Sequence, residues 1–210
     1  MKTIVCYGDS NTWGSDPVTR GRFAHDVRWT GVLQAELGDG YRIIEEGLGG
    51  RTTIVDDPIS PFRNGRDYLV PCLESHRPFD LLTIMLGTND LKQRLNRSAS
   101  DIAESAALLA AMARRLEVGP DGGPPLVLLM APPVVTKLTA LAEMFTGAVE
   151  KSRRFAEHYR QYASWQPGVT FFDAGAIVTS SDLDGIHFEA EEHGKLGRAV
   201  AVAIRELLPG

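Results

Sequence analysis

The length, composition and charge of this chain limit what kind of protein it can be. Its 210 residues, 43% of them hydrophobic, are enough for one compact α/β domain with a buried core, spanning residues 1–210, and too few for two ordinary domains. The net charge of -5, with arginines scattered among acidic residues, argues against a nucleic-acid partner.

Strand-like and helix-like patterns alternate along the sequence. Apolar runs of strand length, several of them apolar on consecutive residues, predict a parallel sheet that is covered on both faces. These runs are 3–7, 41–44, 81–86, 126–130 and 169–172. Helical patterns fill the gaps, at 27–37, 61–73, 100–116, 142–163 and 189–208. The alternation predicts right-handed βαβ crossovers and a three-layer α/β/α sandwich.

The start of the chain and its two cysteines bear on the compartment. The first residues lead directly into the first apolar run, without the basic region and cleavage site of a signal peptide. No run approaches the ~18 apolar residues that span a bilayer. Cys6 lies in a predicted strand and Cys72 in a predicted helix, so we expect two small buried side chains and no disulfide. We therefore expect a cytoplasmic protein with no membrane partner.

Four polar motifs each come directly after an apolar stretch. They are Gly8-Asp9-Ser10-Asn11, Gly47-Leu48-Gly49-Gly50-Arg51-Thr52, Gly87-Thr88-Asn89-Asp90 and Asp184-Gly185-Ile186-His187. In an open α/β sheet, ligands bind beyond the carboxyl ends of the strands, at the point where the strand order reverses. We therefore expect all four motifs to meet at that edge.

Ser10, Asp184 and His187 together have the chemistry of an activated nucleophile. Histidine is well matched to taking a serine proton near neutral pH, and a carboxylate on its other ring nitrogen fixes the tautomer. Each part alone has a plainer interpretation, since Ser10 also suits a helix cap or turn and Asp-x-x-His also suits a capping Asp with a structural histidine. No other histidine has such a carboxylate at a strand end, and His158 is expected at an exposed helical position.

Gly50 and Asn89 can supply hydrogen bonds to an oxyanion. A glycine-rich turn brings a backbone N–H close to a substrate, and a side-chain amide can donate beside it. A plain loop remains the alternative for Gly50. The glycine motif also fails Gly-x-Gly-x-x-Gly at Thr52 and follows the second strand, so a dinucleotide cofactor is not expected. Asp90 is expected to brace a loop or start a helix.

A metal site is not expected in the segment 187–193, although it contains two histidines and three glutamates. The gap of six residues between His187 and His193 does not place them on one helical face, as His-Glu-x-x-His does.

Taken in order, Gly8-Asp9-Ser10, Gly50, Gly87-x-Asn89-Asp90 and Asp184-x-x-His187 resemble the four sequence blocks of the SGNH (GDSL) hydrolase superfamily. Flanking residues such as Val27-Arg28-Trp29-Thr30-Gly31 resemble the bacterial arylesterase/acyltransferase branch, whose members hydrolyse small acyl esters and can pass the acyl group to alcohols or peroxide. The resemblance covers nearly the whole chain and implies a flavodoxin-like sandwich with a five-stranded parallel sheet.

The resemblance also implies roles for individual residues. Ser10 would be the nucleophile, His187 the general base and Asp184 its orienter. The oxyanion hole would comprise the backbone N–H groups of Ser10 and Gly50 with the Asn89 side chain. The resemblance implies a homo-oligomer, from dimer to octamer. The segments 15–22 and 119–125 are shorter than in the octameric members, which predicts a smaller assembly and weaker acyl transfer.

The sequence thus predicts a serine esterase that acts on short-chain acyl or aryl esters through an acyl-enzyme, without metal or organic cofactor, and with some acyl transfer to alcohols. A deacetylase of acetylated carbohydrates is an alternative, because the same residues serve both reactions. A non-enzymatic alternative is a flavodoxin-like module whose Ser10-Asn11-Thr12 loop binds the phosphate of a flavin or nucleotide. That alternative leaves Asp184 and His187 without a role.

Overall fold

Five parallel strands form one sheet in the computed structural model, which describes residues 1–209. Their order is β2-β1-β3-β4-β5. The strands are β1 Lys2–Gly8, β2 Tyr41–Gly47, β3 Leu81–Met85, β4 Leu126–Ala131 and β5 Val169–Asp173. Gly8 at the end of β1 lies opposite Gly47 of β2 and Met85 of β3, so the three strands end at one level. This is the flavodoxin-like strand order, and the predicted fold class is confirmed.

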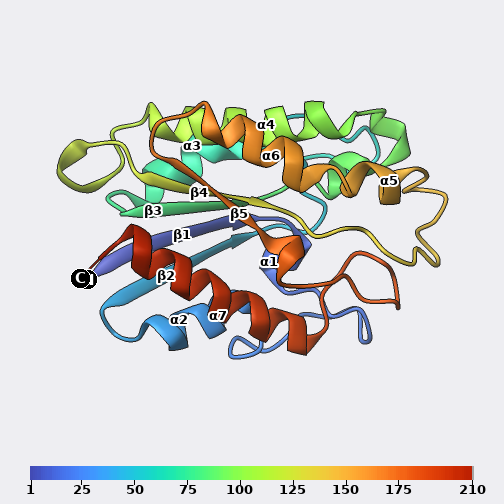
Figure 1. Cartoon of the computed structure of the whole chain (residues 1–210), viewed down its shortest axis with the longest axis horizontal. Coiled ribbons are helices and arrows are strands. Elements are labelled where there is room, and N and C mark those ends of the chain that lie inside the picture. Colours follow the sequence, from blue (N-terminus) through green and yellow to red (C-terminus); the bar gives the residue numbers. More distant parts are fainter. Residues whose placement is uncertain (210) are drawn as a thin grey trace.

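Helices cover both faces of the sheet (Figure 1). α2 (Trp29–Leu37) and α7 (Ala190–Leu207) cover one face, and α3 (Gly65–His76), α4 (Ala99–Arg114) and α6 (Phe155–Ser164) cover the other. The short elements are α1 (Ser10–Trp13), α5 (Ala148–Ser152) and the 3-10 turns Asn89–Leu91, Gln93–Leu95, Pro120–Gly122 and Ala174–Ala176. No helix among residues 1–209 combines the length and apolarity needed to cross a bilayer.

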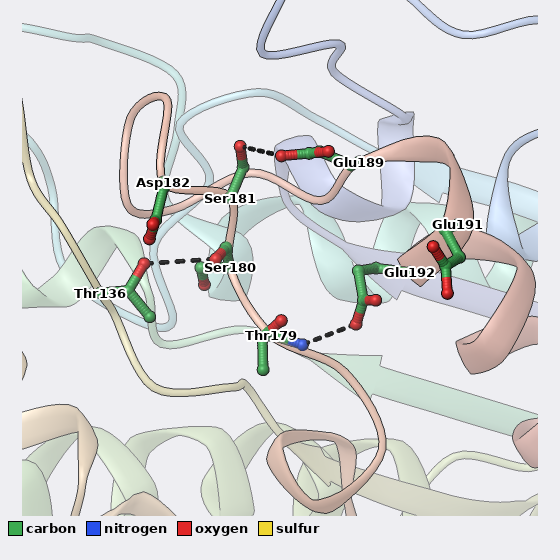
Figure 2. Close-up of a pocket in the computed structure, with 8 residues that line it drawn as sticks. All are labelled: Thr136, Thr179, Ser180, Ser181, Asp182, Glu189, Glu191 and Glu192. Carbon is green, nitrogen blue, oxygen red and sulfur yellow. Dashed lines mark hydrogen bonds between the residues drawn. The ribbon is translucent and has the colours of Figure 1, made fainter.

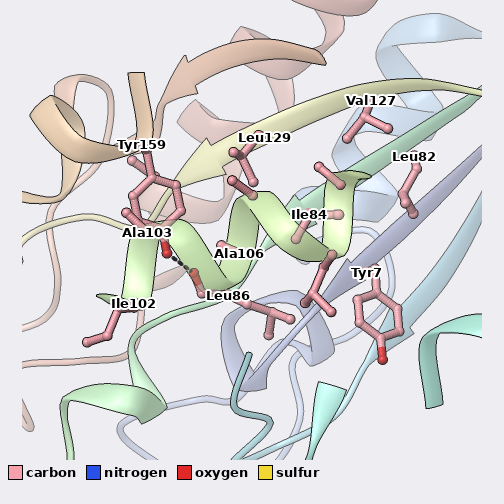
Figure 3. Close-up of a cluster of buried hydrophobic side chains, with 14 of the residues drawn as sticks. Tyr7, Leu82, Ile84, Leu86, Ile102, Ala103, Ala106, Val127, Leu129 and Tyr159 are labelled. Carbon is pink, nitrogen blue, oxygen red and sulfur yellow. Dashed lines mark hydrogen bonds between the residues drawn. The ribbon is translucent and has the colours of Figure 1, made fainter. Parts of the chain in front are cut away.

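Alternation along the strands divides the core into two layers. In β1, Val5 and Tyr7 belong to the cluster under α3, α4 and α6, whereas Ile4 and Cys6 belong to the cluster under α2 and α7. Figure 3 shows part of the first cluster, in which the small residues of α4 allow the helix to lie close to the sheet. Both cysteines are buried and free, as predicted.

One buried hydroxyl in this core reaches toward the carboxyl edge of the sheet. Tyr159 of α6 donates a hydrogen bond of 2.5 Å to the carbonyl oxygen of Leu86, directly after β3 (Figure 3). The contact satisfies a polar group that would otherwise be costly to bury. It also fixes the chain where the Gly87–Asp90 motif begins.

The predicted helix 142–163 is wrong over its first six residues and is interrupted at residues 153–154. Residues 142–147 form turns that end at Gly147, whose φ of 78° is left-handed, and α5 and α6 are separate helices. The oxygen of Ser152, the last residue of α5, accepts a hydrogen bond from the backbone N–H of Val135. Tertiary contacts with the loop after β4 thus override the helical pattern of the sequence.

Two further expectations on this face are corrected. α3 begins at Gly65 instead of residue 61, because the Asn64 side chain caps it by accepting from the N–H of Arg66. His158 is buried, not exposed. It lies three residues after Phe155 and next to Tyr159, so the helical repeat places it on the inner face of α6.

Replacing Gly197 with Ala should destabilise the protein by roughly 1–3 kcal/mol through overpacking. A Cβ atom at Gly197 would lie 2.6 Å from the carbonyl oxygen of Trp29 and 2.7 Å from Cβ of Val32, where α7 crosses α2. Chemical denaturation of both proteins measures the difference in the free energy of unfolding.

Gly194→Ala is the matched control in the same helix. A Cβ there meets only the mobile end of the Arg198 side chain, at 3.3 Å. Because alanine favours the helical backbone over glycine, this variant should be up to about 1 kcal/mol more stable. Equal effects of the two substitutions would show that close packing of α2 on α7 is not what requires Gly197.

Candidate active site

Ser10 lies at the carboxyl end of β1 and is the first residue of α1. The Asp9 side chain caps this short helix by accepting a hydrogen bond of 3.0 Å from the N–H of Asn11. Gly8 is required for the tight exit from the strand, since a Cβ atom there would lie 2.0 Å from Oγ1 of Thr12. The Ser10 side chain therefore sits on a rigid turn, and the residue is 8% exposed.

Asp184 and His187 approach Ser10 from the loop between β5 and α7. Nε2 of His187 is 2.9 Å from Oγ of Ser10, and Nδ1 of His187 is 2.6 Å from Oδ2 of Asp184. The second carboxylate oxygen of Asp184 accepts from the backbone N–H groups of Ile186 and His187, both at 2.9 Å. The structure thus brings the three predicted residues into one hydrogen-bonded chain, in which the imidazole can accept the serine proton.

The Asp184 carboxylate remains charged well below neutral pH. Partial burial raises its pKa, but the hydrogen bonds from the His187 ring and from the two backbone N–H groups outweigh that effect and lower the pKa to about 2. A charged carboxylate at this position favours a proton on Nδ1 and leaves Nε2 free to face Ser10.

Asn11 is a functional candidate that the sequence reasoning missed. Its side-chain amide donates to the carbonyl oxygen of Ile186 and its side-chain oxygen accepts from the N–H of Phe188, both at 3.2 Å. These two backbone groups flank His187 on either side. Asn11 is buried, and its partners are backbone groups distant in sequence, so no local pattern could have revealed them.

Gly50 and Asn89 lie on neighbouring turns at the same edge of the sheet. The N–H of Arg51 donates to the carbonyl oxygen of Leu48 and closes a turn in which Gly50 has a φ of 79°, a left-handed value that favours glycine. The Asn89 amide donates to the carbonyl oxygen of Arg51 at 3.2 Å, which ties the two turns together. Asn89 is 8% exposed, so its amide borders both the protein interior and the site.

Close packing fixes the turn that carries Asn89. Gly87 has a φ of 128°, and a Cβ atom there would lie 2.3 Å from the hydroxyl oxygen of Tyr159, so a side chain would expel the tyrosine. Asp90 accepts from the N–H of Thr53 at 2.9 Å and also bonds to the Thr53 hydroxyl. Asp90 therefore ties the loop after β3 to the loop after β2, which agrees with its predicted role as a loop brace.

Two buried carboxyls and one buried guanidinium shape the charge beneath the site. Burial raises the pKa of both Asp9 and Asp90 to about 6, against opposing hydrogen bonds. The Arg51 guanidinium donates to the carbonyl oxygens of Gly8 and Glu46 and lies 4.1 Å from the centre of the Tyr7 ring. Arg51 thereby joins the ends of β1 and β2 under the glycine turn.

A cavity of about 380 Å³ opens beside Asp184 and His187. Its wall combines apolar side chains with polar ones. It includes Pro17, Leu141, Leu183, Ser15, Arg20 and Thr139. The Thr139 hydroxyl is already bonded to the carbonyl oxygen of Leu183 at 2.7 Å, so part of the polar wall is committed to internal contacts. The cavity has the size and position for a small group attached to the reacting atom.

A second, acid-lined pocket of about 470 Å³ is formed by residues on both sides of the loop that carries Asp184 and His187 (Figure 2). Its polar groups largely bond to one another: the Ser181 hydroxyl donates to Glu189, and the N–H of Thr179 donates to Glu192. The N–H of Ser181 also donates to the carbonyl oxygen of His187 at 2.8 Å. This network holds the loop that carries His187.

His193 is buried in a packing role. Its Nδ1 accepts from the N–H of Trp29 at 3.2 Å, and its ring meets those of Phe23 and Phe188 edge-on. Burial lowers the pKa of His193 to about 4, so the ring is neutral at physiological pH. Its Nδ1 lone pair is therefore used within the protein and not offered to a metal beside His187.

Comparison with known proteins agrees with this geometry. A sequence profile described as the GDSL-like lipase/acylhydrolase family matches residues 6–194. Curated protein sequences give no match.

Similar solved structures include two named esterases. One is a carbohydrate acetylesterase from Sinorhizobium meliloti, with 39% identity over 99% of this chain and 100% of that one and a TM-score of 0.95. Another is an aryl esterase from M. smegmatis, with 41% identity, the same coverage and a TM-score of 0.94. Because the matched profile covers residues 6–194 of 210, the chain belongs to the GDSL-like lipase/acylhydrolase family.

Proposed function

We propose that the protein hydrolyses small carboxylic esters through an acyl-enzyme formed on Ser10. That it is a carboxylic ester hydrolase follows from its family and its esterase neighbours. The observation that supports the mechanism is the hydrogen-bonded chain from Asp184 through His187 to Ser10, with links of 2.6 and 2.9 Å. The flavin- or phosphate-binding alternative gives no role to these hydrogen bonds between Asp184, His187 and Ser10.

Acylation begins when His187 takes the proton of Ser10 and the serine oxygen attacks the ester carbonyl. Asp184 stabilises the imidazolium that forms and keeps the ring oriented. The protonated Nε2 then returns its proton to the departing alcohol, which leaves the acyl group on Ser10. In the second half-reaction, His187 removes a proton from water, and attack of the water releases the acid.

The negative charge on the carbonyl oxygen needs donors that are already in place. We assign this role to the backbone N–H groups of Ser10 and Gly50 and to the Asn89 amide. The support is that Asn89 and the Gly50 turn are tied together through the carbonyl oxygen of Arg51. Donors held by such contacts need little rearrangement as charge develops, which is the main source of catalytic power in sites of this kind.

The substrate class is a short acyl group on a small or aryl alcohol. The cavity beside His187 holds about 380 Å³ and presents Leu141 and Leu183 as apolar contacts. Deacetylation of carbohydrates is a second candidate, favoured by Ser15 and Arg20 in the same wall. One similar structure is that of a carbohydrate acetylesterase, which points the same way. A panel of esters varied first in the acyl part and then in the alcohol separates the two candidates.

Transfer of the acyl group to an alcohol is part of the proposal. An alcohol that enters the cavity competes with water for the acyl group on Ser10, and His187 can activate either. With ethyl acetate and benzyl alcohol in buffer, we expect both benzyl acetate and acetic acid, with the acid in excess. Acid alone at every alcohol concentration would refute transfer and leave hydrolysis standing.

We also propose a homo-oligomer smaller than an octamer. The loop before α3 exposes 73% of Ile59 and 91% of Phe62, and Phe62 has a left-handed φ of 61°. Exposed apolar side chains on one loop suit contact between subunits. Light scattering measures the mass, and a monomer at micromolar concentration would refute this part.

Ser10→Ala should lower kcat on the order of 10⁶-fold, because the acyl-enzyme cannot form. Thermal unfolding should remain that of the folded protein. The control is Ser164→Ala, at an exposed serine of α6 whose hydroxyl bonds only to the carbonyl oxygen of Gln161. More than a few per cent of wild-type turnover in the Ser10 variant, on several esters, would rule out the assigned nucleophile.

Asn89→Ala should lower kcat by roughly 10²–10³, about 2.7–4 kcal/mol, with little change in KM, because the lost hydrogen bond strengthens only in the transition state. Asn89→Asp keeps the size of the side chain but removes its donor, so it should be at least as impaired. A change confined to KM would make Asn89 a substrate-binding residue instead.

Asn11→Ala should lower kcat about 10-fold or more, because His187 loses the two hydrogen bonds that hold its neighbours, each worth roughly 0.5–1.5 kcal/mol. KM should change little, since Asn11 is buried beneath the site. Both kcat and the thermal midpoint should be measured well below unfolding. Full kcat with a lowered midpoint would show that Asn11 supports the fold but not the catalytic geometry.

A further inference from the structure

Glu46, Cys72 and His76 form a cluster of potential metal ligands on the α3 side of the sheet. Cys72 and His76 are four residues apart on α3, so their side chains share one face of the helix. Glu46 comes from β2, one residue before the strand ends. One donor atom from each of the three residues lies within 4.8 Å of the others.

These distances are close to those of a tetrahedral zinc site. Bonds of 2.0–2.3 Å to nitrogen, oxygen and sulfur place ligand atoms roughly 3.2–3.8 Å apart. Nε2 of His76 and Oε1 of Glu46 are 2.7 Å apart, so an ion between them would separate them slightly. From a spacing of up to 4.8 Å, the Cys72 sulfur would have to move inward by as much as roughly 1–1.6 Å to reach those ligand distances.

The exposure of the three side chains defines the open side of the cluster. Cys72 is fully buried, whereas the side chains of His76 and Glu46 are 26% and 18% exposed. An ion can therefore enter from the solvent side, between His76 and Glu46, and meet the thiol at the bottom. Because this side faces solvent, water would be the fourth ligand.

We propose that Glu46, Cys72 and His76 bind one zinc-class divalent cation, with water completing a tetrahedron. On binding, the thiol releases its proton to solvent and the ion replaces the hydrogen bond between His76 and Glu46. The thiolate and carboxylate charges then balance the ion. Because Arg51 adds a positive charge nearby, through its bond to the Glu46 carbonyl oxygen, we expect weaker binding than at a four-ligand structural site.

This site is separate from the ester chemistry. None of its ligands belongs to the hydrogen-bonded chain of Ser10, His187 and Asp184, and that chain needs no Lewis acid. Treatment with a chelator should therefore leave ester hydrolysis unchanged. The result of the metal experiment and the result of the esterase assay are independent of each other.

The test is titration of the chelator-treated full-length protein with Co²⁺. A bound thiolate gives a sulfur-to-cobalt charge-transfer band, and tetrahedral geometry gives intense visible bands; we expect both to saturate at one equivalent and to disappear when Zn²⁺ is added. Cys72→Ala should abolish the charge-transfer band, and His76→Gln should weaken binding at least 10-fold. Cys6→Ala and His25→Ala, at a cysteine in the other core layer and an exposed histidine, should bind as the wild type does.

A second measurement guards against misfolded variants. Zn²⁺ should raise the thermal midpoint of the wild type and of Glu46→Asp, but not that of Cys72→Ala or His76→Gln, each compared with its own metal-free form. Absence of the cobalt bands in the folded wild type would overturn the proposal. So would bands of equal intensity in Cys72→Ala, because they would arise elsewhere in the chain.

Discussion

The proposed catalytic geometry depends on three hydrogen bonds between the turn after β1 and the loop before α7. Ser10 meets His187, and Asn11 meets the backbone on either side of it, across separations of 175 and 177 residues. A single contact would leave the imidazole free to rotate about it. Three contacts from adjacent residues fix both the position of the loop and the direction of Nε2, so the imidazole already faces the Ser10 hydroxyl without substrate.

The parallel sheet makes these contacts possible, and close packing of side chains against glycine backbone makes the exit turns rigid. Because β1, β2 and β3 end at one level, their three exit turns lie side by side and can bond to one another. Gly8 and Gly87 leave no room for a Cβ atom, so Thr12 and Tyr159 press directly on the main chain. Tyr159 of the buried core under α4 and α6 therefore contacts the same turn that positions Asn89. A packing defect in this core would displace that turn.

Sequence patterns predicted the sheet, its strand ends and the residues that meet there, because alternation and strand-end rules act over a few residues. They failed where distant contacts decide the structure. The helix 142–163 has a helical pattern, but Gly147 and the bond from Val135 to Ser152 break it. The side chain of Asn11 gives no local signal of its partners. Cys72 and His76 share a helix face in the sequence, but Glu46 joins them only when β2 packs beside α3.

The separation of the reacting groups along the chain has a consequence for biosynthesis. Ser10 is synthesised 177 residues before His187, so the nucleophile candidate always precedes its base. Until His187 has been made, the Ser10 hydroxyl lacks the base of the proposed mechanism, so a shorter nascent chain should not take an acyl group from an ester. Only the complete sheet, with β5 added at its edge and α7 closing over it, joins the two halves of the site. On the proposed mechanism, reactivity at Ser10 therefore reports that the chain has been made and folded at least as far as α7.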